Sequence, residues 1–98
     1  MAKKITFIAR MTCKPDKASE FVGLCRQLEA HVRAHEPGTL LYEFYKLREA
    51  NRYAVLESFR DEAAEHLHMN SKILAEVAPK LSACLDGTWV REYFDGLD

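Results

Sequence analysis

The sequence lacks the features that mark membrane, secreted and disulfide-rich proteins. No apolar run among its 98 residues approaches the roughly 20 residues that a membrane-spanning helix needs. The first residues, MAKKITF, lack the long apolar region of a signal peptide. Cys13, Cys25 and Cys84 are odd in number and show no CxxC spacing, so we expect them to be buried as small apolar side chains. These absences together predict a cytoplasmic protein.

The chain also has no large excess of charge of either sign and no phosphate-binding motif. The net charge is −1 at pH 7 and no run of basic residues occurs, so no general field attracts nucleic acid or an anionic membrane. GxGxxG, GxxxxGK[ST] and GxSxG are all absent, which leaves nucleotide binding and serine hydrolysis without support. We therefore expect no cofactor, no nucleic-acid partner and no membrane partner.

The composition that is present is that of an ordinary globular domain. Apolar residues make up 48% of the chain and charged residues 30%. No repeat, low-complexity segment or linker divides the chain. We expect a single domain over residues 1–98, with enough chain for a modest core.

Alternating apolar residues and turn signals predict four strands and two helical regions. Pro15 ends the first strand, Pro37 follows the first helix and Gly87 closes the second helical region. Within that region Ser71 should begin a new helical piece, and Pro79 should kink or restart it. The predicted strands are residues 4–13, 39–47, 53–59 and 88–94, and the predicted helical regions are residues 17–35 and 61–85.

This order, βαββαβ, predicts the fold class. The compact arrangement is α+β and ferredoxin-like, an antiparallel sheet with both helical regions on one face. Such a sheet should carry polar residues on its other face. Here both faces are apolar, with Ile8 alternating with Phe7 and Leu56 alternating with Val55. The second face needs a cover, and we expect a homodimer in which two copies pair through it.

The best candidate site lies in the stretch YAVLESFRDEAAEHLH, residues 53–68. Glu57 stands in the middle of a predicted strand, among apolar neighbours. Asp61 is a good N-cap for the helix that follows. On that helix Ala64, Leu67 and His68 should share a face, because residues three and four apart are neighbours. A strand with one carboxylate therefore leads into a helix with one imidazole.

Both residues have a functional and a structural interpretation. His68 could move a proton or donate a hydrogen bond to a substrate carbonyl, because imidazole titrates near neutral pH. It could equally be a core histidine bonded to a backbone carbonyl or to Glu57. Glu57 could orient His68, or it could form an ion pair with Arg10 or Arg91, since an unpaired buried carboxylate is costly.

Aromatic residues and a histidine pair are weaker candidates. Tyr42 and Phe44 share one strand face and could line an aromatic pocket or belong to the core. His31 and His35 stand four apart on the first predicted helix, as a metal-binding pair would. No third ligand has a suitable spacing, so we expect no metal site.

Five segments in order resemble the antibiotic-biosynthesis-monooxygenase (ABM) domain family. They are CKPDKASEF, EPGTLLYEF, YAVLESFRDEAAEHLH, NSKILAEV and GTWVREYFDGL. Two positions depart from the family pattern: Phe59 stands where tryptophan is frequent, and Asp16 replaces the usual glycine of a turn. The ending, REYFDGLD, is similar to the branch that includes the enzyme processing phosphorylated autoinducer-2, as opposed to the quinol monooxygenases.

The resemblance implies a dimeric α+β barrel and a cofactor-independent oxygenase acting on a quinol or polyphenol. Its proton-handling residues would be His68 as base and Glu57 beside it. Two alternatives stay open: an isomerase or tautomerase of a small hydroxycarbonyl metabolite, with or without a phosphate, and a dimer that binds a small molecule without catalysis. The substrate-binding residues implied are Tyr42, Phe44, Phe59 and Arg10.

Overall fold

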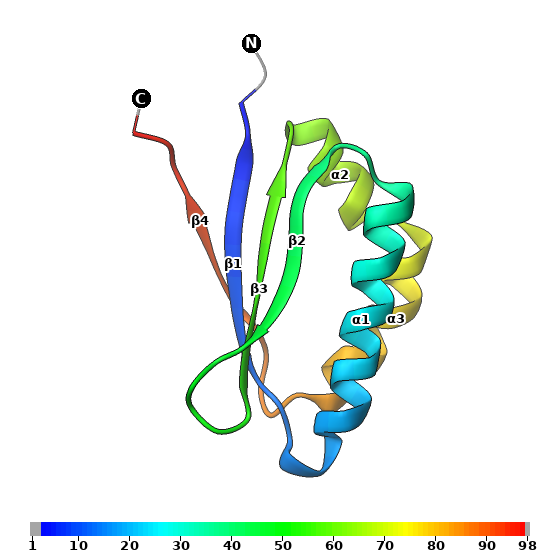
Figure 1. Ribbon diagram of the computed structural model, residues 1–98, viewed down its shortest axis with the longest axis vertical. Coiled ribbons are helices and arrows are strands. Elements are labelled where there is room, and N and C mark those ends of the chain that lie inside the picture. The colour runs from blue at the N-terminus through cyan, green and yellow to red at the C-terminus, as the bar shows by residue number, and fades with distance from the viewer. Residues whose placement is uncertain (1–2, 98) are drawn as a thin grey trace.

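Four antiparallel strands form one sheet, and helices cover one of its faces (Figure 1). A computed structural model describes residues 3–97, so residues 1, 2 and 98 of the expected domain lie outside it. The sheet order is β2-β3-β1-β4 with every neighbouring pair antiparallel, which confirms the ferredoxin-like α+β prediction. The elements are β1 (Ile5–Thr12), a short 3₁₀ turn (Pro15–Lys17), α1 (Ala18–His35), β2 (Thr39–Lys46), β3 (Arg52–Phe59), α2 (Glu62–Met69), α3 (Lys72–Cys84) and β4 (Val90–Phe94).

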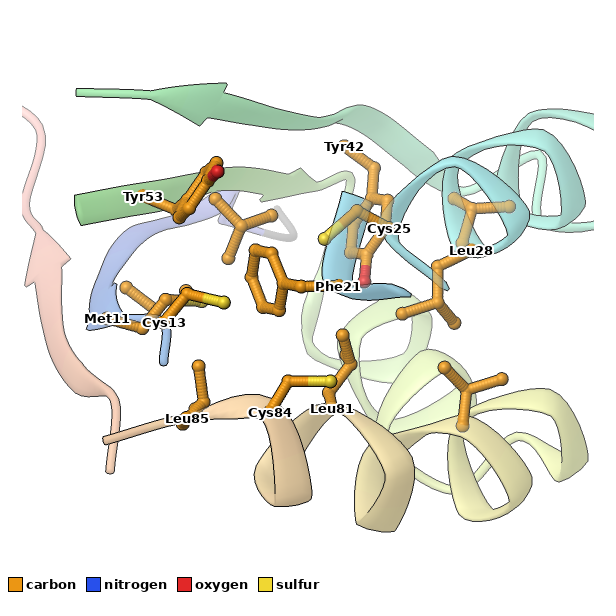
Figure 2. Packing of buried hydrophobic residues seen from close by; sticks show 14 of the residues in the cluster. Met11, Cys13, Phe21, Cys25, Leu28, Tyr42, Tyr53, Leu81, Cys84 and Leu85 are labelled. Carbon is orange, nitrogen blue, oxygen red and sulfur yellow. The ribbon is translucent and has the colours of Figure 1, made fainter. Parts of the chain in front are cut away.

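The core lies between the inner face of the sheet and the helices. β1 alternates as expected, with its odd-numbered residues from Phe7 to Met11 buried. The stripe of α1 packs onto them, and Figure 2 shows Phe21 at the centre of the cluster, between Tyr53 and the end of α3. The rings of Phe21 and Tyr53 are 4.9 Å apart. All three cysteines are buried and free, as predicted.

The helix starts follow the predicted caps. The Asp61 carboxylate accepts a hydrogen bond from the Ala64 amide at 2.8 Å, and the Ser71 hydroxyl accepts one from the Leu74 amide at 3.3 Å. The predicted restart at Pro79 is wrong, because α3 is continuous from Lys72 to Cys84. Buried residues on both sides of the exposed proline, such as Val77, hold the helix together across it.

The predicted inward face of α2 needs one correction. Ala64 and His68 are buried, but Leu67 is 57% exposed. Consecutive residues of an α-helix point about 100° apart. With Ala64 and His68 turned towards the sheet, Leu67, directly before His68, therefore points to solvent.

The outer face of the sheet, away from the helices, is mixed, so the expectation of an apolar second face is confirmed only in part: Arg10 and Glu92 also lie on it. Cross-strand pairing places Ile8 beside Leu56 on this face, with Tyr45 and Phe94 towards its two sides. Tyr45 and Phe94 are 44% and 45% exposed. Within residues 3–97 no helix combines the length and the apolar character needed to cross a membrane.

A side chain of α1 also hydrogen-bonds to the edge strand β2. The Glu29 carboxylate accepts a hydrogen bond from the Phe44 amide at 2.8 Å. This amide points away from β3, so no strand in the described part of the chain offers it a carbonyl acceptor.

Candidate functional site

A cavity of about 180 Å³ lies between the inner face of the sheet and the helices. The hollow forms where one row of paired residues crosses the sheet from Phe44 through Val55 and Ala9 to Arg91. The methyl side chain of Ala9 leaves space that the larger side chains on either side do not fill. Apolar walls include Tyr42, Phe44, Leu74 and Trp89, and the polar lining residues are Glu57, His68 and Arg91.

A larger depression of about 680 Å³ lies beside α2 and β4, but it holds no buried group. Charged residues of both signs surround it, including Lys4 and Glu62, and all of them contact solvent. The smaller cavity brings a buried histidine and a buried carboxyl group, His68 and Glu57, to one wall, so the candidate site is there.

His68 lies between two carboxyl groups. Its Nδ1 is 2.8 Å from Oε1 of Glu36, and its Nε2 is 3.5 Å from Oε1 of Glu57. The imidazole is 1% exposed and its ring lies 4.9 Å from the ring of Tyr42 and 5.4 Å from that of Phe59. The sequence alternative in which His68 adjoins Glu57 therefore matches the structure, and a second carboxyl group is present that the sequence did not indicate.

Glu36 is the functional candidate that sequence reasoning missed. It follows α1 directly and is only 5% exposed. Gly38 explains the burial, because a Cβ at this position would lie 2.7 Å from the Cβ of Ala64. The absence of that Cβ lets the turn approach α2 closely enough for Glu36 to reach His68. The signal in the sequence that could have pointed to Glu36 is the acidic residue directly before a Pro-Gly pair.

The other contacts of Glu36 hold its carboxylate in place. Its Oε1 also accepts a weak hydrogen bond from the Thr39 hydroxyl at 3.4 Å. Its Oε2 is buried and has no hydrogen-bond partner among residues 3–97. With Glu36 as a carboxylate, which can only accept, the proton of the short bond lies on Nδ1 of His68 and Nε2 carries the free lone pair.

Glu57 is 6% exposed, and its Oε1 lacks a hydrogen-bond partner in the described part of the chain. Burial raises the pKa of Glu57 from its ordinary 4.5 to about 8; Arg91 works in the opposite direction, while the charges of Glu65 and Glu36 add to the rise. At neutral pH this group therefore mainly holds a proton. Neither Arg10 nor Arg91 comes within 4.0 Å of it, so the predicted ion pair is absent from the described residues.

The structure brings some of the other candidates to the cavity and separates two from it. Tyr42 and Phe44 line it. Phe59 is fully buried behind the His68 ring and does not reach the cavity. Arg10 lies on the outer face, where its Nη1 is 3.3 Å from Oε1 of Glu92, because it follows the inward-facing Ala9. Arg91, paired with Ala9 across the sheet, is the arginine that reaches the cavity.

His31 and His35 lie against each other, with ring centroids 4.4 Å apart. Among residues 3–97, no group of three histidine, cysteine, aspartate or glutamate side chains is arranged to hold a metal ion.

The arrangement can move a proton in a dry environment. The Glu36 carboxylate fixes the tautomer of His68 and stabilises the imidazolium that forms when Nε2 takes a proton. The apolar walls exclude water from Nε2, which strengthens electrostatic interactions around any anion formed there. The site is therefore suited to deprotonating a small hydroxyl-bearing ligand.

Comparisons with known proteins agree with one another. The family model for antibiotic biosynthesis monooxygenase matches residues 4–80. YcnE of Bacillus subtilis (strain 168), a proposed monooxygenase, is 34% identical over 86 residues, which is 84% of this chain and 90% of that protein.

Solved structures show the same fold. A proposed antibiotic biosynthesis monooxygenase from Caulobacter crescentus CB15 aligns with a TM-score of 0.93 at 28% identity, covering 99% of this chain and 92% of that one. A conserved protein from Methanosarcina mazei Go1 aligns with a TM-score of 0.85 at 30% identity, covering 93% and 90%. SnoaB from Streptomyces nogalater, a cofactor-independent oxygenase solved as the N63A mutant, aligns with a TM-score of 0.80 at 22% identity, covering 99% and 96%, which shows the fold alone.

Proposed function

Because this chain belongs to the antibiotic biosynthesis monooxygenase family, we propose that it is a cofactor-independent monooxygenase of a small, electron-rich phenol or quinol. One observation carries the proposal: His68 is held between Glu36 and Glu57 at the wall of an apolar cavity. The likeness to SnoaB, a cofactor-independent oxygenase, is consistent with it.

The first step would be proton transfer to His68. A substrate hydroxyl in the cavity gives its proton to Nε2, while Glu36 stabilises the imidazolium through Nδ1. The resulting phenolate is electron-rich enough to pass one electron to O₂. The protein's task is to form this anion and to keep water away from it.

Oxygen insertion then follows with atoms and electrons in balance. The substrate radical and superoxide join through a new bond between oxygen and a ring carbon that carries hydrogen. That carbon loses its hydrogen as a proton while the O–O bond breaks, which releases water and leaves a carbonyl group. One phenol and one O₂ therefore give one quinone and one water, and no external reductant is needed.

Oxygen consumption with substituted hydroquinones and naphthols tests this proposal. We expect wild-type protein to consume O₂ and His68→Asn to lose about 10²–10⁴-fold in turnover, because asparagine cannot accept the proton. His66→Asn is the matched control, since His66 lies exposed on the same helix. Full turnover per folded molecule in His68→Asn would remove His68 from the mechanism. A wild-type protein that consumes no O₂ with any member of the panel contradicts the proposed reaction.

Arg91 favours one alternative function. Its place at the cavity would suit the phosphate of a small hydroxycarbonyl metabolite, with His68 as the base of an isomerase or tautomerase. Such an enzyme would convert its substrate without consuming O₂, so the same oxygen measurement separates the two reactions. A protein that binds ligands without converting any would be the non-catalytic module.

A homodimer remains part of the proposal. The apolar residues of the outer face, Ile8 and Leu56 at its centre and the exposed Tyr45 and Phe94 at its sides, support pairing of two copies through this surface.

A further inference from the structure

The volume of the cavity limits the size of its ligand. Its roughly 180 Å³ compares with the roughly 150 Å³ of an engineered cavity that binds benzene. Sites for drug-sized molecules usually have about 300–1,000 Å³. A single substituted aromatic ring therefore fits between Tyr42, Phe44 and Trp89, and a molecule of three or four fused rings does not.

The cavity has a cation two strands away from the strand that carries its buried carboxyl. Arg91 lies on β4 and Glu57 on β3, with β1 between them and a shift of two residues along the strands. Strands about 4.8 Å apart and residues about 3.3 Å apart separate the two Cα atoms by roughly 12 Å. Both side chains point to the same face of the sheet, and the Arg91 guanidinium lies over the ring of Phe7, the residue paired with Glu57, so one small ligand can reach both groups.

The guanidinium of Arg91 has no anionic partner in residues 3–97. No carboxylate in this range lies within 4.0 Å of it, and it is the arginine of the described residues that lines the cavity. It lies 4.7 Å from the centroid of the Phe7 ring, which holds it over the floor of the sheet. An arginine held this way beside an apolar cavity is suited to a ligand oxyanion, since its fork of N–H donors matches carboxylate and phosphate oxygens.

We propose that the ligand is a one-ring phenol or catechol that carries an oxyanion substituent, either a carboxylate or a phosphate. Its hydroxyl lies at His68 and Glu57, its ring lies between the aromatic walls, and its oxyanion accepts hydrogen bonds from Arg91. As a substrate this compound rests on the proposed monooxygenase function, but as a ligand it does not.

Binding can be measured without turnover. Trp89 is the single tryptophan of the chain and lines the cavity, so its fluorescence reports occupancy. The probes are 3,4-dihydroxybenzoate, its neutral methyl ester, hydroquinone monophosphate, unsubstituted hydroquinone and a tricyclic hydroxyanthrone. Titration calorimetry under nitrogen gives their dissociation constants independently of the fluorescence.

We expect the carboxylate or the phosphate to bind about 10-fold or more tightly than its neutral counterpart, as a charge-assisted bond predicts. Whichever anion shows the larger preference identifies the oxyanion. In Arg91→Gln this preference should disappear, and in Arg91→Lys it should be partly kept. Arg33→Gln is the control for loss of one positive charge, since Arg33 is exposed on α1 away from the cavity. Circular dichroism melts establish that each variant is folded.

Equal affinity for anionic and neutral compounds would overturn the proposal, as would tighter binding of the hydroxyanthrone or a preference that survives Arg91→Gln. If Arg91→Gln does not fold, Arg91→Lys and the wild-type comparison still decide. Selective anion binding without oxygen consumption would leave the ligand class standing and refute the monooxygenase function. Oxygen consumption together with equal affinity for anionic and neutral compounds would support the monooxygenase function and refute the proposed ligand class.

Discussion

Replacing Glu57 by glutamine tests the electrostatics of the site through protein stability. Glu57 has a pKa of about 8 in the folded protein against an ordinary 4.5, chiefly because it is buried. Between these two pH values the folded protein keeps a proton that the unfolded chain has lost. The stabilisation from this proton is complete below about pH 4.5 and disappears as the pH rises through about 8.

The size of the effect follows from this difference. Each pH unit inside the window lowers the free energy of unfolding by about 1.4 kcal/mol. From pH 5 to pH 7 the loss is therefore about 3 kcal/mol, a large part of the stability of a small domain. His68 Nε2 lies 3.5 Å from Glu57, so the measured titration belongs to the pair. Glutamine has the shape of a protonated glutamate and releases no proton, so Glu57→Gln should lack this loss.

Urea unfolding followed by circular dichroism at pH 5, 6, 7, 8 and 9 measures the difference. The free energies of unfolding of wild type and Glu57→Gln should be nearly equal at pH 5. As the pH rises to about 8, the wild type should lose stability, so the variant should become progressively more stable than the wild type. Glu76→Gln, an exposed change on α3, should follow the wild type at every pH. A difference between wild type and Glu57→Gln that does not change with pH would show that Glu57 is ionised throughout, and the reasoning would be refuted.

Three further changes test other parts of the structure. Glu36→Gln should lower the free energy of unfolding by about 1–3 kcal/mol and reduce turnover, because it weakens a buried charge-assisted bond to His68; urea unfolding and kinetics on one preparation measure both, and unchanged values would contradict the contact. Leu56→Glu should give a monomer in sedimentation velocity at micromolar concentration, whereas Leu67→Glu, exposed on α2, should leave a dimer; a dimeric Leu56→Glu would place the interface elsewhere. Ala9→Leu should fill the cavity floor and abolish the Trp89 fluorescence response to ligands, at a cost of about 1–3 kcal/mol in stability; an unchanged response would mean that ligands bind outside the cavity.

Most of the fold was predictable because local patterns and overall packing agree. The period-two alternation of β1 and β3 put Phe7 and Ile8, and likewise Glu57 and Leu56, on opposite faces, and the cap at Asp61 fixed the start of α2. His68 then faced the sheet by its spacing from Ala64. These inferences needed only the periodicity of strands and helices.

The rest depended on contacts between distant segments. Glu36 reaches His68 across 32 positions of sequence, through a close approach at Gly38 that no pattern reveals. Alternation separates the two faces of each strand, but only the register of β4 against β1 shows that Arg91 lies on the cavity side. The cavity volume is set by how the side chains around Ala9 pack, which is a property of the whole fold.

The bond between Glu29 and the Phe44 amide has a consequence for how copies of this chain can assemble. A sheet grows from molecule to molecule only if each copy offers two open edges, one to receive a strand and one to pass the pattern on. The Glu29 carboxylate of α1 occupies the Phe44 amide, a donor on β2 that an incoming strand would need. At the opposite edge, β4 is exposed along its whole length. An incoming strand at β2 would have to displace the Glu29 carboxylate, so strand addition is disfavoured at β2 compared with β4, and repeated addition into a fibre is disfavoured with it.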